Sequence, residues 1–352
     1  MRRERNNAAA SRAVDLVSLA ELVEQFASKT VVVLGDFVAD EYQFGDISRV
    51  SREAPVLILR HRETHLAPGG GANAANNFAA LGARVSLVTA AGEDAAGRAL
   101  VDYFRQRQVD VSGIVRVKGW TTPTKTRFLA GWAHTVGQQV LRVDREPHTP
   151  LPESAQKKLQ ANLHGRLRKA DAFAVSDYGF GAVTPALVRS ARPYCKAGAP
   201  VTLDSRHHLL AYAKAGVTSA TPNEAELEAL HHVSIGQNVA ALRRCGEATL
   251  REMKLRALLV TRGRDGMALF EPKQGMTHIA VHGSNQAVDV TGAGDTVLAA
   301  YTLALACGGS PLEAAHLANI AGGLVVMKRG TATVSREELL AAIRAEAGGA
   351  AS

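Results

Sequence analysis

Five runs of apolar, largely aliphatic residues recur along the chain, separated by longer mixed segments. They cover residues 31–36, 84–91, 172–177, 201–204 and 257–263. Continuous apolar runs of this length favour strands that are buried on both faces, and the segments between them are long enough to hold helices. The pattern therefore predicts an α/β fold with a mostly parallel central sheet that is covered by helices on both faces.

Three of these predicted strands end in an acid, namely Asp36, Asp177 and Asp204. The carboxyl ends of parallel strands lie along one edge of the sheet, and ligands of open α/β folds bind at that edge. We therefore expect functional side chains to follow the strand ends.

Residues 38–66 and 113–145 show mixed alternation without a helical period, which predicts short strands outside the main sheet that form a small β-sheet lid. The first 13 residues are polar and Ala-rich, and a helical period follows from 14 to 27 with Ser18 as candidate cap. The expected organisation is a tail and peripheral helix over 1–29, one domain over 30–345 that contains both lid segments, and a tail over 346–352.

Composition and charge narrow the class of ligand. Of the 352 residues 46% are apolar, which can build a sizeable core, and Lys plus Arg exceed Asp plus Glu by 41 to 33, a formal net charge of +8. An anionic small molecule fits this charge. Nucleic acid is not expected as a partner, because the charge is spread along the sequence and no basic block has interleaved aromatics.

The three cysteines, Cys195, Cys245 and Cys307, are far apart in the sequence. Their odd number and spacing predict free thiols in a reducing compartment, without a disulfide framework or a zinc site. The longest apolar runs fall short of the roughly 20 residues that cross a bilayer, and the N-terminus has no apolar signal-peptide core. We therefore expect a cytoplasmic protein without a membrane partner.

The segment 289–296, Asp-Val-Thr-Gly-Ala-Gly-Asp-Thr, is a loop that opens a predicted helix. Backbone N–H groups at a helix start lack intrahelical partners and bind anions. Asp295 stands in the same turn, where a carboxylate is useful if it deprotonates a hydroxyl that attacks a phosphate. The loop suggests a phosphotransferase with Asp295 as base. The alternative is a structural cap, because Asp, Thr and Gly are common at helix ends and turns.

Residues 68–77, Pro-Gly-Gly-Gly-Ala-Asn-Ala-Ala-Asn-Asn, also lead from glycines into a helix. Consecutive glycines let the backbone approach a ligand closely, and asparagine side chains suit sugar hydroxyls because they donate and accept. The alternative is a flexible linker before a packed Ala-rich helix.

Residues 221–228, Thr-Pro-Asn-Glu-Ala-Glu-Leu-Glu, open a further predicted helix. Asn223 and Glu226 are three apart and share a face, which suits a site for Mg²⁺ and a nucleotide. The alternative is an ordinary acidic first turn that the helix dipole favours.

Together these motifs resemble the ribokinase-like (PfkB) family of sugar kinases. The segment 68–77, Asn223 with Glu226, Thr261-Arg-Gly263 with Gly266, and the loop 289–295 occur in the order of the family, over about residues 30–345. The resemblance implies a ribokinase-like fold for that domain. It also implies a small-molecule sugar or sugar phosphate as acceptor, with ATP and Mg²⁺ as cofactors.

The resemblance assigns roles to single residues. Asp295 corresponds to the base, and Gly292, Ala293 and Gly294 correspond to the anion hole around the transferred phosphoryl group. Asn223 and Glu226 correspond to the pair that orders Mg²⁺ and phosphate, Glu226 through water, and Thr261, Gly263 and Gly266 to nucleotide contacts. Sugar contacts are implied for Asp36, Asp40, Gly69, Gly70 and Asn73. A monovalent cation such as K⁺ is implied near Asp289 and Thr291, shared with the segment after Gly322.

Within the family, the chain is most similar to the kinases that phosphorylate the C1 hydroxyl of a heptose 7-phosphate in ADP-heptose synthesis. The similar stretches are residues 35–42, 48–56, 124–127, 138–144, 176–178 and 328–335. A phosphorylated acceptor needs fixed cations, and Arg49, Lys125, Arg127 and Arg142 lie in the predicted lid segments. Solvated strand charges are the alternative for these four.

Three features depart from the heptose kinases. Gln43 replaces an aromatic residue, the segment Asp204-Ser-Arg-His replaces Asp-Pro-Lys-Gly, and residues 131–137 form a longer connection. Other hypotheses therefore stay open: a kinase of the same fold for another sugar, sugar phosphate or nucleoside, and a catalytically silent sugar- or nucleotide-binding regulator. A homodimer is expected, because lid strands expose edges and lids of the family pair.

Overall fold

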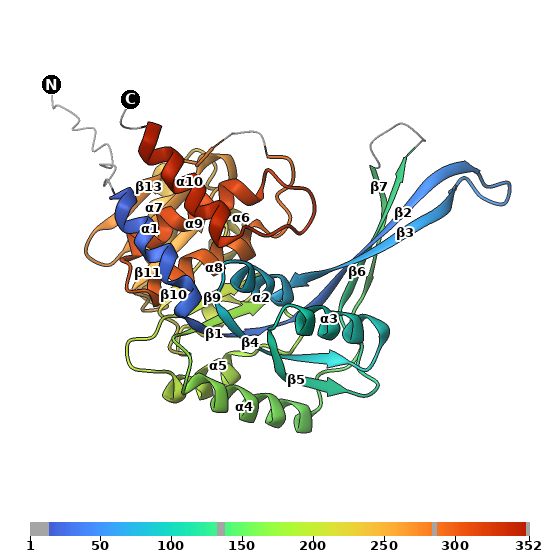
Figure 1. Cartoon of the computed structure of the whole chain (residues 1–352), viewed down its shortest axis with the longest axis horizontal. Coiled ribbons are helices and arrows are strands. Elements are labelled where there is room, and N and C mark those ends of the chain that lie inside the picture. The colour runs from blue at the N-terminus through green and yellow to red at the C-terminus, as the bar shows by residue number, and fades with distance from the viewer. Residues whose placement is uncertain (1–13, 132–137, 284–286, 350–352) are drawn as a thin grey trace.

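The computed structural model describes residues 14–131, 138–283 and 287–349. Within these residues, nine strands form a central sheet in the order β13-β12-β11-β10-β9-β8-β1-β4-β5, and four strands form a smaller sheet in the order β3-β2-β6-β7 (Figure 1). Residues 132–137 of the predicted longer connection, residues 1–13 of the predicted N-terminal tail and residues 350–352 of the predicted C-terminal tail lie outside the described residues.

The central sheet is mostly parallel, as the sequence predicts. Its strands are β1 (Thr30–Gly35), β4 (Arg84–Gly92), β5 (Asp110–Val117), β8 (Ala172–Asp177), β9 (Val201–Ser205), β10 (Ser219–Ala220), β11 (Ala257–Thr261), β12 (Met267–Glu271) and β13 (Gly275–Ile279). All neighbouring pairs from β5 to β11 are parallel, and β12 and β13 continue the sheet as antiparallel strands at one edge.

Helices cover both faces of this sheet. One face carries α1 (Leu16–Glu24), α2 (Gly71–Ala80), α3 (Ala95–Gln106), α8 (Ala293–Ala306), α9 (Pro311–Val325) and α10 (Arg336–Gly349). The other carries α4 (Glu153–Leu167), α5 (Pro185–Ala191), α6 (Glu224–His231) and α7 (Val239–Glu252). The short 3₁₀ turns are η1 (Gln25–Ser28), η2 (Arg192–Tyr194), η3 (Leu209–Tyr212) and η4 (Gly263–Asp265).

Strand β1 shows why the apolar runs are continuous. Val31 and Val33 pack into the core under α2 and α8, whereas Val32 and Leu34 pack into the core under α4 and α7. Successive side chains of a strand point to opposite faces, so a strand covered on both faces needs an apolar residue at every position.

The smaller sheet is the lid. It contains β2 (Phe37–Val50), β3 (Leu57–Gly70), β6 (Thr124–Gly131) and β7 (Gln138–Arg145), and it extends away from the body of the molecule (Figure 1). Asp36 alone separates β1 from β2, and β3 runs directly into α2. The base of the lid is therefore anchored at the carboxyl edge of the central sheet.

Three expectations differ from the structure. Residues 113–117 belong to β5, which pairs parallel with β4 in the central sheet, because alternation alone does not identify the sheet that a strand joins. The strands β2 and β3 have 14 residues each rather than being short, since register shifts at Phe44/Gly45 and Ile47/Arg49 interrupt the alternation. Asp15, not Ser18, caps α1, and the Ser18 hydroxyl donates to Glu313 instead.

The three cysteines are free, as predicted. In the part of the chain that the structure describes, no helix has the length and apolar character needed to cross a bilayer.

Candidate active site

Asp295 lies in the first turn of α8 and is 2% exposed. Both of its carboxylate oxygens accept a hydrogen bond: Nδ2 of Asn73 donates to Oδ2 at 2.8 Å, and the Tyr178 hydroxyl donates to Oδ1 at 3.3 Å. Burial raises the pKa of Asp295 to about 7, against these two hydrogen bonds, which lower it. A carboxylate whose pKa lies near neutrality is suited to accept a proton as a general base.

The loop before Asp295 is shaped as the anion-hole prediction requires. Gly292 is the N-cap of α8, with φ +76°, and a Cβ at this position would lie 2.5 Å from Nδ2 of Asn73. Among the described residues, the backbone N–H groups of Gly294 and Asp295 donate to no protein acceptor. They are free to bind an anion at the helix N-terminus, where the dipole adds partial positive charge.

The glycine-rich segment at the start of α2 brings backbones together rather than forming a linker. A Cβ at Gly71 would lie 2.5 Å from Cα of Gly35, and one at Gly69 would lie 2.5 Å from Oδ2 of Asp40. This close approach places Asn73, which is fully buried, beside Asp295. Its Oδ1 accepts from Nδ2 of Asn77, so both polar groups of the Asn73 side chain have protein partners. The predicted contact of Asn73 with a sugar hydroxyl stays a prediction.

Asp36 lies at the end of β1. The side chain is 0% exposed, and its two oxygens accept the backbone N–H groups of Tyr178, Phe180 and Ala182 at 2.8–3.1 Å. Burial raises the pKa of Asp36 to about 6, although these hydrogen bonds lower it. The structure therefore places Asp36 beneath the turn after β8, and its contact with a sugar hydroxyl stays a prediction.

The predicted lid cations lie around Asp40. Nη1 of Arg127 forms a 2.6 Å ion pair with Oδ1 of Asp40, while Arg142 binds Asp144 through two 2.9 Å hydrogen bonds. Lys125 pairs in register with Asp40 on the neighbouring strand, and its Nζ lies 5.7 Å from the centre of the Tyr178 ring. Within the described residues neither Lys125 nor Arg49 has an ion pair, and of these two Lys125 lies beside Tyr178 while Arg49 is exposed on β2.

The opposite side of the site holds two acids, Asp204 and Glu226. Asn223 caps α6, with Glu226 accepting from its backbone in a reciprocal capping box. Burial, followed by the charges of Glu226, Asp295 and Asp177, raises the pKa of Asp204 well above its usual value. Oδ2 of Asp204 would lie 3.9 Å from a Cβ at Gly294. The described residues contain no cluster of three or more metal-ligating side chains. Two carboxylates beside an anion-binding loop would suit a divalent cation that arrives with a nucleotide.

The predicted nucleotide contacts follow the next strand. Thr261 ends β11 and pairs with Asn223, so this strand end adjoins the Glu226 motif. Gly263 has φ +53° and is exposed. Gly266 is buried, and a Cβ there would lie 2.1 Å from the carbonyl oxygen of Ile279, so its role in this structure is to permit the turn into β12.

The predicted cation loop is joined to the segment after α9. The Asp289 carboxylate accepts the N–H groups of Thr291 and Gly330, both at 2.9 Å, and its own N–H donates to the carbonyl of Val326. These hydrogen bonds lower the pKa of Asp289, whose burial opposes them. The two segments that the prediction names therefore lie together.

Three residues that the sequence did not predict as site residues lie in the same group. Tyr178 binds Asp295, Asp204 approaches Gly294, and the Arg206 charge acts on Lys125, Asp204 and Glu226. Each follows a predicted strand end, 177 or 204. The acids at these strand ends, Asp177 and Asp204, indicated the region, but no residue type singled out Tyr178 or Arg206.

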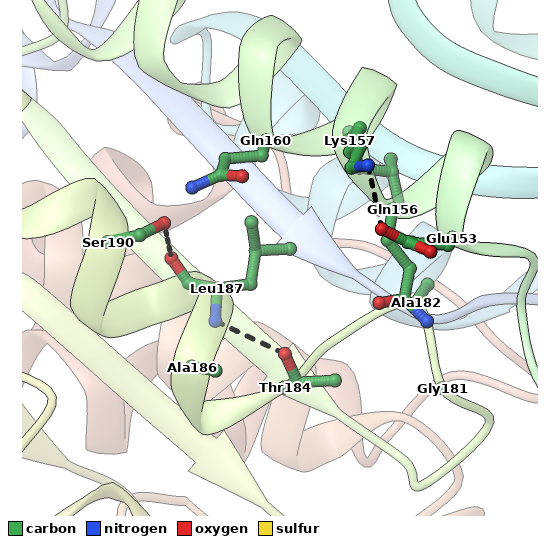
Figure 2. Close-up of a pocket in the computed structure, with 11 residues that line it drawn as sticks. Glu153, Gln156, Lys157, Gln160, Gly181, Ala182, Thr184, Ala186, Leu187 and Ser190 are labelled. Carbon is green, nitrogen blue, oxygen red and sulfur yellow. Dashed lines mark hydrogen bonds and ion pairs between the residues drawn. The ribbon is translucent and has the colours of Figure 1, made fainter.

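A hollow of about 280 Å³ between α4 and α5 lies apart from this group (Figure 2). Glu153, Lys157, Gln160, Thr184 and Ser190 are among its lining residues. None of the predicted catalytic, substrate or nucleotide residues lines it. It shares Gly181 and Ala182 with the turn that Asp36 holds, and we do not assign it to the reaction.

Comparison with known proteins agrees with this arrangement. Residues 28–338 match the family described as pfkB family carbohydrate kinase. The bifunctional protein HldE of Geobacter metallireducens is 39% identical over 311 residues, 88% of this chain and 62% of the relative. That of Caulobacter sp. strain K31 is 40% identical over 328 residues, 92% of this chain and 64% of the relative. The chain thus spans less than two thirds of the length of these curated relatives.

Solved structures show the same fold. Phosphofructokinase-2 from Escherichia coli in complex with substrates and products has a TM-score of 0.72 at 20% identity, covering 90% of this chain and 98% of the other. Arabidopsis thaliana ribokinase complexed with ribose and ATP has a TM-score of 0.67 at 22% identity, covering 90% and 99%. With the family match over most of its length, the chain belongs to the pfkB family of carbohydrate kinases.

Proposed function

We propose that this chain transfers the γ-phosphoryl group of ATP to the C1 hydroxyl of D-glycero-D-manno-heptose 7-phosphate. The observation that carries the reaction type is the buried Asp295, held by Asn73 and Tyr178 beside the free N–H groups of the α8 N-terminus. A base and an anion site in one turn serve the two needs of phosphoryl transfer, namely a deprotonated nucleophile and stabilisation of charge on the phosphoryl oxygens.

In this proposal Asp295 takes the proton of the acceptor hydroxyl as its oxygen bonds to phosphorus. The N–H groups of Gly294 and Asp295 donate to the phosphoryl oxygens, and Gly292 keeps the loop close to Asn73. ATP supplies the phosphoryl group, and ADP is the leaving group. Positioning and fixed donors thus carry the catalysis, with no covalent protein intermediate.

The residues present fit Mg²⁺ with a nucleotide. Asp204 and Glu226 bring two carboxylates together, and mutual repulsion with burial raises the pKa of Asp204, so a divalent cation would relieve an excess of negative charge there. Asn223, Thr261 and Gly263 then line the nucleotide side. A monovalent cation near Asp289 and Thr291 stays a proposal on the joined segments 289–291 and 326–330.

The phosphorylated acceptor is supported by the lid. Lys125 has no ion pair within the described residues and lies next to Tyr178, whereas Arg127 and Arg142 are already paired with Asp40 and Asp144. Lys125 is therefore the lid cation that we propose to bind the substrate phosphate. The choice of heptose as the sugar rests on the resemblance to the heptose 7-phosphate kinases. Another sugar phosphate is the second candidate, favoured by the departure Asp204-Ser-Arg206.

We further propose a cytoplasmic homodimer that pairs through the lids. The outer strand β7 has no partner beyond β6 in the described structure, and Val140, Leu141 and Val143 on it are 42–55% exposed. Exposed strand edges with apolar residues need covering, and a second lid would supply the cover. Light scattering after size exclusion tests this, with Leu141→Asp expected to give monomers.

The reaction is tested by ADP release with Mg-ATP and a panel of acceptors: heptose 7-phosphate, the unphosphorylated heptose, fructose 6-phosphate and ribose. We expect the highest kcat/KM with heptose 7-phosphate and a 1,7-bisphosphate product by ³¹P NMR. Turnover of a different acceptor alone would change the proposed substrate but would still support the proposed phosphoryl transfer. Full activity of Asp295→Asn with any of them would sink the role of the base, since its removal should cost about 10²-fold or more.

A further inference from the structure

Tyr178 links the lid to the base, a connection that the proposed reaction does not by itself explain. Its hydroxyl donates to Oδ1 of Asp295 at 3.3 Å, and its ring lies 3.3 Å from where a Cβ of Gly70 would stand. Nζ of Lys125 lies 5.7 Å from the centre of the same ring, within the range of a cation–π contact. One aromatic side chain therefore contacts the base, the glycine-rich segment and the lid cation.

Two buried acids fix the turn that carries Tyr178. Asp36 accepts from the N–H groups of Tyr178, Phe180 and Ala182. Asp177 accepts from the N–H of Gly179, the Ser205 hydroxyl and the Tyr212 hydroxyl, at 2.8–2.9 Å. A buried carboxylate that is held by several donors is costly to move, because each broken hydrogen bond leaves a charged acceptor unsatisfied. Asp36 and Asp177 thus fix the turn and with it the position of the Tyr178 hydroxyl.

We propose that Tyr178 is a positioning residue for the transfer, whose hydroxyl fixes Oδ1 of Asp295 while Asn73 fixes Oδ2. With both oxygens held, the carboxylate cannot rotate, and its remaining lone pairs are presented to the acceptor hydroxyl in one orientation. The inference rests on the proposed role of Asp295 as base.

The hydroxyl also tunes the charge of that base. A donor to the carboxylate favours the ionised form and lowers its pKa, whereas burial of Asp295 and the charge of Asp40 raise it. The other charged groups that act with Asp295 are Lys125 from β6, which lowers the pKa of Asp295, and Asp204 from β9, whose own pKa is raised by burial and, in smaller part, by the charge of Asp295. None of these charged groups changes in a Tyr178→Phe variant, so the variant isolates the effect of the hydroxyl on the pKa of Asp295.

The test compares Tyr178→Phe with the wild-type enzyme over pH 5.5 to 9.5. The ring stays, so packing on Gly70 and the contact with Lys125 are kept. We expect kcat/KM to fall about tenfold at pH 6.5 and the acid limb of the profile to move up by roughly 0.5 to 1 pH unit, the effect of one lost hydrogen bond to a charged group. At pH 9 the loss should be smaller but should not vanish, because Asp295 is then ionised in both enzymes and only the lost orientation of its carboxylate remains.

The matched control is Tyr103→Phe. The Tyr103 hydroxyl donates to Oδ1 of Asn76 at 3.2 Å and does not contact Asp295. It should keep both the rate and the profile. A Tyr178→Phe profile that superimposes on the wild type, or a loss of equal size at every pH, would overturn the proposal, since a merely structural defect does not follow the ionisation of Asp295. Wild-type enzyme that turns over no acceptor would instead contradict the proposed function, and an unchanged melting temperature shows that the variant is folded.

Discussion

Asn73 and Asp295 are 222 positions apart in the sequence, and a 2.8 Å hydrogen bond joins their buried side chains. The bond connects the first turn of α2 to the first turn of α8, one helix after the lid strand β3 and one after the loop 289–292. A second link, from the Thr296 hydroxyl to Oδ1 of Asn77 at 2.7 Å, lies one turn further along α2 and one residue further along α8. The helix that follows the lid strand β3, α2, therefore also holds Asp295, so the lid and the catalytic loop are both attached to α2.

Gly292→Ala should damage this support. A Cβ there would lie 2.5 Å from Nδ2 of Asn73, and φ is +76°, a region that alanine adopts only with strain. We expect a loss of kcat of about 10²-fold, because the Asn73 amide must move away from Asp295. Kinetics with saturating ATP and acceptor measure this.

The matched control for that change is Gly198→Ala, at φ +80° with no atom within 4 Å of the added Cβ. It carries the same backbone strain without the collision, and it should lower the melting temperature while leaving kcat unchanged. Equal losses of kcat in the two variants would mean that backbone strain alone, and not the contact with Asn73, limits the enzyme.

Asp295→Asn should remove activity and increase stability in a pH-dependent way. The pKa of Asp295 is about 7 in the folded chain and 3.8 as the reference for the unfolded chain, so the folded state holds a proton that the unfolded state releases between these values. The free energy of unfolding therefore falls as pH rises through this window, by about 1.4 kcal/mol per pKa unit, and the cost is complete above pH 7. Asparagine avoids this cost.

Thermal unfolding of the two proteins at pH 5 and pH 8 checks that sign. The melting temperature of Asp295→Asn should exceed that of the wild type at pH 8, with a smaller difference at pH 5. A difference of the same size at both pH values would show that the carboxylate is not the source, and a less stable variant at pH 8 would contradict the raised pKa.

The sequence predicted the parts of this molecule that depend on local rules. Continuous apolar runs predicted the parallel sheet because β1 is covered on both faces. The segment 289–296 was placed correctly at the start of a helix, because Gly292 is the N-cap of α8 and Asp295 lies in its first turn. Residues 113–117 were assigned to the lid because strand alternation does not say which sheet a strand joins. Its partner, β4, is chosen by tertiary packing.

The site was harder to predict, because similar polar residues end up facing different ways. Asp36 and Asp40 are four apart, yet one is buried beneath the turn after β8 and the other pairs with Arg127 in the lid. The sequence did not predict that Asn73 donates to Asp295, 222 positions away. Side-chain direction at a strand end depends on where the chain turns, and the pattern of residue types does not contain that information.

Lys125→Ala should separate phosphorylated from unphosphorylated acceptors. The Lys125 ammonium has no ion pair within the described structure. Burial lowers the pKa of Lys125, and the negative charge of Asp40 raises it by a smaller amount. With heptose 7-phosphate we expect KM to rise about 10- to 50-fold, and with the unphosphorylated sugar we expect little change. Arg142→Ala is the matched control, because its guanidinium is already bound to Asp144, and its KM should change less than threefold. The same rise for both acceptors would place Lys125 elsewhere in the reaction.

Arg206→Ala should act on the nucleotide and not on the sugar. Arg206 follows β9 and is exposed, its backbone N–H is anchored on the carbonyl of Asp177, and its charge lowers the pKa of Asp204 and Glu226. A cation on this side of the loop 292–294 can neutralise the phosphates of ATP, so its loss should raise KM for ATP about tenfold and leave KM for the acceptor unchanged. Arg189→Ala on α5, outside the site, is the control. A raised KM for the acceptor alone would assign Arg206 to the substrate phosphate and would explain why this position departs from the heptose kinases.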